Sequence, residues 1–145
     1  MPEHSGWLVE DHVIITYLWG YVPLDDVQHN ADTVAKLVYQ VNAHAPIHII
    51  VDATQHTNPI NNFIGVREAT RELLNHPDIG WVLIFGYRTS PINQFIVRAV
   101  CTVFGIRFRF VDTFDEARLF LQSIDLTLDE NIPDPTPPPG WTGNL

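Results

Sequence analysis

The chain has 145 residues and a formal net charge of −9, and 46% of its residues are hydrophobic against 17% charged. This length predicts one domain with a sizeable core. The acidic balance excludes general binding to nucleic acids, which requires clustered Lys and Arg. The single cysteine, Cys101, excludes an internal disulfide framework. No window reaches the roughly 18 apolar residues of a membrane span, and no signal-peptide pattern opens the chain. We therefore expect a cytoplasmic protein.

Nine segments follow one another in the order strand, strand, helix, strand, helix, strand, helix, strand, helix. Short runs rich in Val, Ile, Phe and Trp predict five strands, at residues 6–9, 13–19, 47–51, 81–85 and 106–111. Apolar residues at helical spacing predict four helices, at about residues 24–41, 60–75, 91–104 and 114–123. The first two strands are expected to form an antiparallel hairpin.

The helix starts carry recognisable signals. Asp25 and Asp26 provide acidic residues for a first turn. Ser90 followed by Pro91 predicts a capped third helix, and Thr113 with Glu116 predicts a capping box for the fourth. The third helix is expected to turn its apolar residues toward the core: Ile92, Phe95, Ile96, Ala99, Val100, Val103 and Phe104.

The stretch from Pro46 to Asn62 organises the predicted sheet. Its apolar run ends at Asp52, a loop of small and polar residues follows, and a helix begins near Ile60. Open α/β sheets place their binding groups at the carboxyl ends of strands, and the loop after the next strand should lie beside this one. The predicted partner- or ligand-binding surface consists of Asp52, Thr54, Thr57, Asn61, Asn62, Arg88 and Thr89.

The composition changes near the end of the chain. A proline-rich run, residues 134–140, does not suit a helix or a strand. We therefore expect a domain at residues 1–125 and a mobile or polyproline II tail at residues 126–145, with Trp141 either docking on the domain or anchoring a partner.

This order of elements resembles the SpoIIAA-like superfamily, which contains the STAS (anti-sigma factor antagonist) domains. The residues that carry the resemblance are Val51-Asp52 at the end of the third strand, the loop to the helix at Ile60, and residues 111–117 at the start of the last helix. The resemblance implies an α/β superhelix of strand–helix units, with a five-stranded mixed sheet and four helices mainly on one face.

The resemblance also implies a non-enzymatic regulatory module. STAS domains typically bind a kinase or scaffold partner through the loop after the third strand and the helix that follows, and many carry a phosphorylatable serine there. This chain has Asn61-Asn62 near that position, so the nearest candidate phosphoacceptors are Thr54 and Thr57.

No cofactor is expected. No metal site is expected either, because Pro46 keeps His44 and His48 from sharing a helical face. Exposed strand edges favour a homodimer.

Two alternatives remain open. Related SpoIIAA-like domains include types that bind lipids or small ligands, and Phe63, Ile64, Phe95 and Ile96 would line such a pocket here. A hydrolase-like enzyme would use Asp52 and His56 as an acid–base pair. Against the enzyme, the sequence contains no GxSxG elbow, no glycine-rich phosphate loop and no evident third member of a triad.

Overall fold

The computed structural model describes residues 3–41, 46–57, 62–87, 90–128 and 132–141. These residues form a single α/β domain, with a five-stranded mixed sheet and four helices. Its elements are β1 (Glu3–Val9), β2 (Val13–Gly20), α1 (Leu24–Tyr39), β3 (Ile47–His56), α2 (Phe63–Leu74), β4 (Ile79–Phe85), α3 (Pro91–Val103), β5 (Phe108–Val111) and α4 (Phe114–Ile124). The predicted number, type and order of the elements are confirmed.

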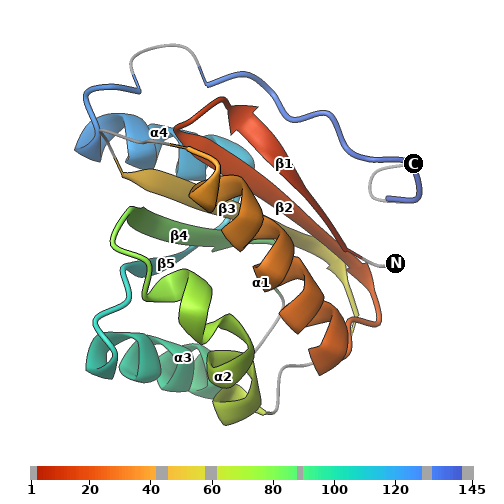
Figure 1. The fold of residues 1–145 in the computed structure, drawn as a ribbon. Helices are drawn as coiled ribbons and strands as arrows, with labels where there is room; N and C mark the ends of the chain where they lie inside the picture. Colours follow the sequence, from red (N-terminus) through yellow and green to blue (C-terminus); the bar gives the residue numbers. More distant parts are fainter. Residues whose placement is uncertain (1–2, 42–45, 58–61, 88–89, 129–131, 142–145) are drawn as a thin grey trace.

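The strands lie in the sheet in the order of the chain, β1-β2-β3-β4-β5. The β1–β2 hairpin is antiparallel and the other three pairs are parallel. Each parallel pair needs a crossover helix, and right-handed crossovers that always step in the same direction leave their helices on the same face. Figure 1 shows this arrangement, with α1, α2 and α3 on one side of the sheet and α4 on the other.

Strand alternation divides the core into two layers. In β3, Ile49 packs toward α1 and α2, whereas Ile50 packs toward α4. The layer under α4 also includes Leu121, Leu128 and Ile132. Because both faces of the sheet are covered, its central strands are apolar almost continuously, as the sequence predicted.

The third strand is longer than predicted. β3 does not end at Asp52 but continues to His56, because Gln55 and His56 pair with Trp19 and Gly20 of β2. The residues expected to form the start of a loop are therefore held in the sheet. α2 begins at Phe63, and the preceding residues 58–61 lie outside the described part of the chain.

The prediction that α3 turns its large apolar residues inward is wrong for several of them. Ile92, Phe95 and Val103 are each more than 70% exposed. α3 is described over its full length, and none of its side chains is buried, whereas α1, α2 and α4 each bury two or three. The helix is apolar on both sides, so periodicity alone did not identify the side that faces the sheet.

The described part of the C-terminal segment contacts the domain. Leu128 and Ile132 belong to the core beneath α4, beyond the boundary expected at residue 125. Further along, the rings of Trp141 and Tyr17 meet edge to face, with centroids 6.1 Å apart. Residues 132–139 form neither helix nor strand, in keeping with their proline content.

Candidate functional site

An apolar cavity of about 220 Å³ lies between the sheet and the helices α1, α2 and α3. The strands contribute the side chains that alternate toward this face, among them Ile49 and Val51 of β3 and Phe108 and Phe110 of β5. Parallel pairing sets these residues side by side across β2 to β5. The floor of the cavity is therefore a direct consequence of strand alternation.

The outer wall of the cavity is α3. Val97, Val100 and Cys101 line the cavity, but the helix has no buried side chain to fill it. Burial raises the pKa of the Cys101 thiol, so this thiol stays protonated and behaves as a small apolar group. The space between the sheet and α3 is thus bounded by hydrocarbon on both sides.

Most polar side chains in the cavity wall are already hydrogen-bonded within the protein. Thr16 Oγ1 lies 2.8 Å from Ser5 Oγ, Asn30 donates to the Glu3 carboxylate at 2.8 Å, and Thr70 donates to the Val66 carbonyl at 2.8 Å. Burying such groups costs little once they are paired. They leave the cavity apolar in character.

Arg67 of α2 is the one charged residue in the cavity wall among those that the structure describes. Its guanidinium carbon lies 4.0 Å from the ring centroid of Phe104, directly after α3. Its side chain is 20% exposed, so it extends from the apolar wall to solvent. A cation therefore lies at the rim of an otherwise apolar cavity.

Asp52 and Thr54 are hydrogen-bonded to each other. Asp52 is buried, and its Oδ1 accepts hydrogen bonds from the Thr54 amide at 3.0 Å and the Thr54 hydroxyl at 2.6 Å. Asp52 thus holds β3 where its register with β2 shifts, between Asp52 and Gln55, and it does not line the cavity. Its charge, together with burial, raises the pKa of Tyr17 on the adjacent strand to about 12, burial being the larger cause.

The remaining residues of the predicted surface are dispersed. Thr57 and Asn62 are exposed, and Asn62 Oδ1 caps α2 by accepting from the Gly65 amide at 2.8 Å. Asn61, Arg88 and Thr89 lie outside the described residues. One link to the cavity exists at this end of the sheet, because the neighbouring Tyr87 lines it.

The structure does not bring Asp52 and His56 together as an acid–base pair. Both belong to β3, and the strand rise separates residues four apart by roughly 13 Å. The ring of His56 instead lies 5.8 Å from that of Tyr87, which stacks on Phe110 in the cavity wall. Burial lowers the pKa of His56.

Of the four residues named in advance as pocket-lining, Phe63 lines the cavity. Ile64 and Phe95 point to solvent, and Ile96 is half-buried outside the described wall. The cavity itself was not located from the sequence, because its existence depends on how far α3 stands from the sheet.

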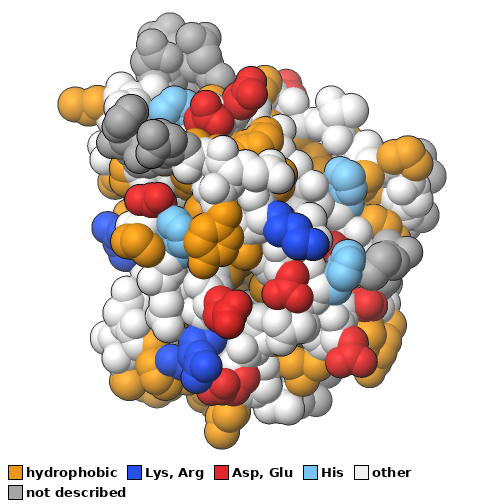
Figure 2. Space-filling model, viewed as in Figure 1, with side chains coloured by type: hydrophobic (Ala, Val, Ile, Leu, Met, Phe, Trp, Pro, Cys, Tyr) orange, Lys and Arg blue, Asp and Glu red, His pale blue; other side chains and the backbone are white. Residues whose placement is uncertain are grey.

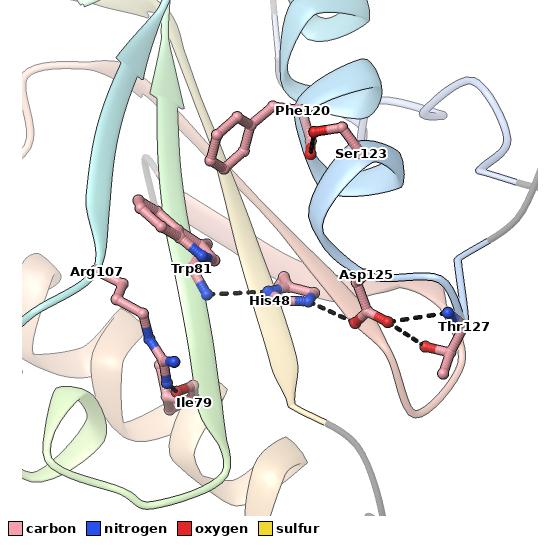
Figure 3. Close-up of polar contacts among 8 residues, drawn as sticks. All are labelled: His48, Ile79, Trp81, Arg107, Phe120, Ser123, Asp125 and Thr127. Carbon is pink, nitrogen blue, oxygen red and sulfur yellow. Dashed lines mark hydrogen bonds and ion pairs between the residues drawn. The ribbon is translucent and has the colours of Figure 1, made fainter.

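A polar cluster centred on His48 (Figure 3) was not predicted from the sequence either. His48 is 1% exposed and lies on the α4 side of β3, opposite a bulge in β4. Its Nδ1 accepts a hydrogen bond from the Trp81 amide at 2.9 Å, so the proton lies on Nε2, which donates to Asp125 Oδ2 at 2.8 Å. Asp125 also accepts from the Thr127 amide and hydroxyl. A histidine within an apolar strand indicates a buried polar group that needs a hydrogen-bond partner, but the sequence around His48 does not identify Asp125 as that partner.

The pKa values of this cluster follow from burial and hydrogen bonding. Burial lowers the pKa of His48 and outweighs the opposing effect of Asp125. Burial raises the pKa of Asp125, but hydrogen bonds from Thr127 and His48 outweigh it, so the net shift is downward. The pair is therefore a neutral imidazole donating to a carboxylate, which is a structural link rather than an acid–base couple accessible to solvent.

Within the described ranges, no group of three or more His, Cys, Asp or Glu is placed to hold a metal ion. Over the same residues, no helix is long and apolar enough to cross a membrane. Figure 2 shows acidic, basic and apolar side chains interspersed on the face that carries α1 and α2, without a continuous basic stripe on that face. Comparison with protein-family models and with curated proteins found no match for this chain.

Proposed function

We propose that this chain is a non-enzymatic binding module that holds a small apolar ligand in the cavity between the sheet and α3. The observation that carries the proposal is the cavity itself, about 220 Å³ in volume and walled by aliphatic and aromatic side chains. Concave, mostly apolar spaces with few polar groups are the usual form of small-molecule sites. The consecutive strand order is also what a SpoIIAA-like domain of the ligand-binding type would have.

Titration with the neutral fluorescent probe N-phenyl-1-naphthylamine tests this function. We expect saturable binding of one probe per chain, and a melting temperature that rises with probe concentration, since a ligand that binds only the folded state stabilises it. Val100→Trp places a large ring in the cavity and should abolish binding. Phe95→Trp adds its ring on the exposed side of the same helix and serves as the matched control.

Two results would contradict this function. One is non-saturable probe binding by the wild-type protein. The other is equal binding by the Val100→Trp and Phe95→Trp variants, which would place the probe on the surface.

A second function, STAS-type docking of a kinase- or scaffold-like partner, is supported by the exposed apolar side chain of Ile64 in the first turn of α2. Thr57, which is exposed, is then the more accessible phosphoacceptor, because the Thr54 hydroxyl is bonded to Asp52. A second copy of the chain is the partner that can be tested directly.

Light scattering over a range of protein concentrations tests this self-association. We expect a dimer that Ile64→Glu dissociates, while Leu126→Glu, at a similarly exposed site outside α2, leaves it intact. A monomer at every concentration would remove the homodimer from consideration.

A further inference from the structure

We propose that the ligand class is a single-chain amphiphile with a carboxylate head, of which a medium-chain fatty acid is the simplest example. Arg67 would bind the head, and the hydrocarbon chain would occupy the cavity. This inference rests on the proposed binding function and adds the chemistry of the ligand to it.

The charge of Arg67 is only weakly compensated within the described residues. The nearest carboxylate is that of Glu68, with Arg67 Nη1 and Glu68 Oε1 separated by 3.4 Å. Glu68 is itself largely exposed and is shared with Arg71 at 3.7 Å. A guanidinium group has five N–H donors in a planar fork that matches a carboxylate. Arg67 therefore has the capacity to take a carboxylate from a ligand.

The position of Arg67 matches that of a head group on an inserted chain. Its guanidinium is held over the Phe104 ring, which fixes it between α2 and the end of α3. The side chain forms part of the apolar wall while retaining contact with solvent. An amphiphile needs this combination, because its chain gains from leaving water and its charged head does not.

The volume of the cavity restricts the chain. At about 220 Å³ it exceeds the roughly 150 Å³ of an apolar cavity that binds benzene. It is smaller than the roughly 300–1,000 Å³ of sites for drug-sized ligands. One aliphatic chain of medium length is therefore the appropriate size, and two acyl chains would not be enclosed.

The test compares decanoate with decanol, which shares its chain length and lacks its charge. The affinity of each for the full-length protein is measured at pH 8 by calorimetry, for the wild type and for the Arg67→Gln and Arg71→Gln variants. Arg71 lies on the same helix, is more exposed and is not part of the cavity wall, which makes it the matched control.

We expect the wild type to bind both compounds and to prefer decanoate. Arg67→Gln should weaken decanoate binding about tenfold, as expected for a lost charge-assisted hydrogen bond, and leave decanol binding unchanged. Arg71→Gln should change neither. Arg67→Lys keeps the charge without the planar fork, so its affinity for decanoate should lie between those of the wild type and Arg67→Gln. This intermediate affinity would show that the loss in Arg67→Gln comes from the missing charge and not from unfolding.

The outcomes distinguish this inference from the function on which it rests. Equal decanoate binding by the wild type and Arg67→Gln would overturn the assignment of Arg67, as would an equal loss of both compounds in Arg67→Gln. Decanol binding without decanoate binding would overturn the ligand class and retain the apolar site. Failure of the wild type to bind either compound would overturn both proposals.

Discussion

His48 takes the place of a backbone acceptor where β4 bulges, with Gly80 and Trp81 opposite the single residue His48 of β3. A neutral imidazole with its proton on Nε2 is the form that can accept from the Trp81 amide and donate to Asp125 at once. If Nδ1 were protonated, its N–H would face the Trp81 N–H, and two donors cannot form a hydrogen bond with each other. The side chain therefore contributes to stability only while it is neutral.

The unfolding free energy should consequently decrease as the pH falls below about 6.5, the ordinary pKa of histidine. Burial lowers the pKa of His48 in the folded state, so the unfolded chain takes up the proton first, and acid favours unfolding. Urea denaturation at pH 7.5 and 5.5 measures the slope. His56 shifts in the same direction, so the test is made in a His56→Gln background. Replacing His48 by Gln there should flatten the slope, and an unchanged slope would contradict this role.

Gly80 is required by the same histidine. A Cβ atom at residue 80 would lie 2.4 Å from His48 Nδ1, so the imidazole would have to leave its hydrogen bonds. We expect Gly80→Ala to lower the unfolding free energy by about 2 kcal/mol, the scale of overpacking or of an unpaired buried group. Gly6→Ala, where the nearest atom would be 3.9 Å away, should cost much less in the same urea experiment. Equal costs would show that the fit around His48 is not tight.

Local hydrogen bonds at single residues were predictable from the sequence. Ser90 and Thr113 cap α3 and α4 by accepting the amides of Asn93 and Glu116, and the Glu116 carboxylate accepts from the Asp112 amide. Each of these bonds spans three or four residues. The His48–Asp125 bond spans 77, and no short-range signal connects its ends.

Among the elements, α3 differs from the other helices because it covers the sheet without being embedded in it. Helices in proteins depend mainly on tertiary packing for their stability, and α3 has no buried side chain. The sequence located the start of this helix correctly from its cap. It did not determine which side faces the sheet, because Phe95 and Val100 are both apolar and lie on different sides.

Hydrogen exchange should therefore distinguish α3 from α1. We expect the amides in the middle of α3 to exchange by local opening well before those of α1, which buries Ala31, Val34 and Val38. Adding decanol should slow exchange in α3 selectively, because the ligand would supply the packing that the cavity lacks. Exchange of both helices at one common rate would mean that α3 opens only with the whole domain.

At the scale of the whole molecule, the sequence predicted the irregular backbone of the C-terminal segment better than the contacts of its side chains. Prolines exclude regular structure there, but they do not prevent isolated apolar side chains from packing. Leu128 and Ile132 do so beneath α4, and Trp141 lies against Tyr17. The order of strands and helices along the chain followed from hydrophobic periodicity, whereas these contacts depend on a sheet face formed by distant residues.

Ile132 should behave as a core residue despite its place in a proline-rich segment. It is only 4% exposed, so Ile132→Ala is expected to lower the unfolding free energy by about 2–4 kcal/mol. Pro137→Ala changes an exposed residue of the same segment and should leave stability nearly unchanged. Both costs can be read from urea denaturation, and a negligible cost at Ile132 would mean that the segment is detached in solution.

The contact between Trp141 and Tyr17 also bears on the order in which the protein folds. From β2 to β5, each strand pairs with the one formed just before it, so most of the sheet can assemble from contacts that are close in sequence. The C-terminal segment reverses this direction and returns to β2. It becomes available only after all five strands have been synthesised. Trp141 is therefore a fluorophore at a contact that completes late in folding. In a variant whose other three tryptophans, all in strands, are replaced by Phe, its emission would report on that step separately from formation of the sheet.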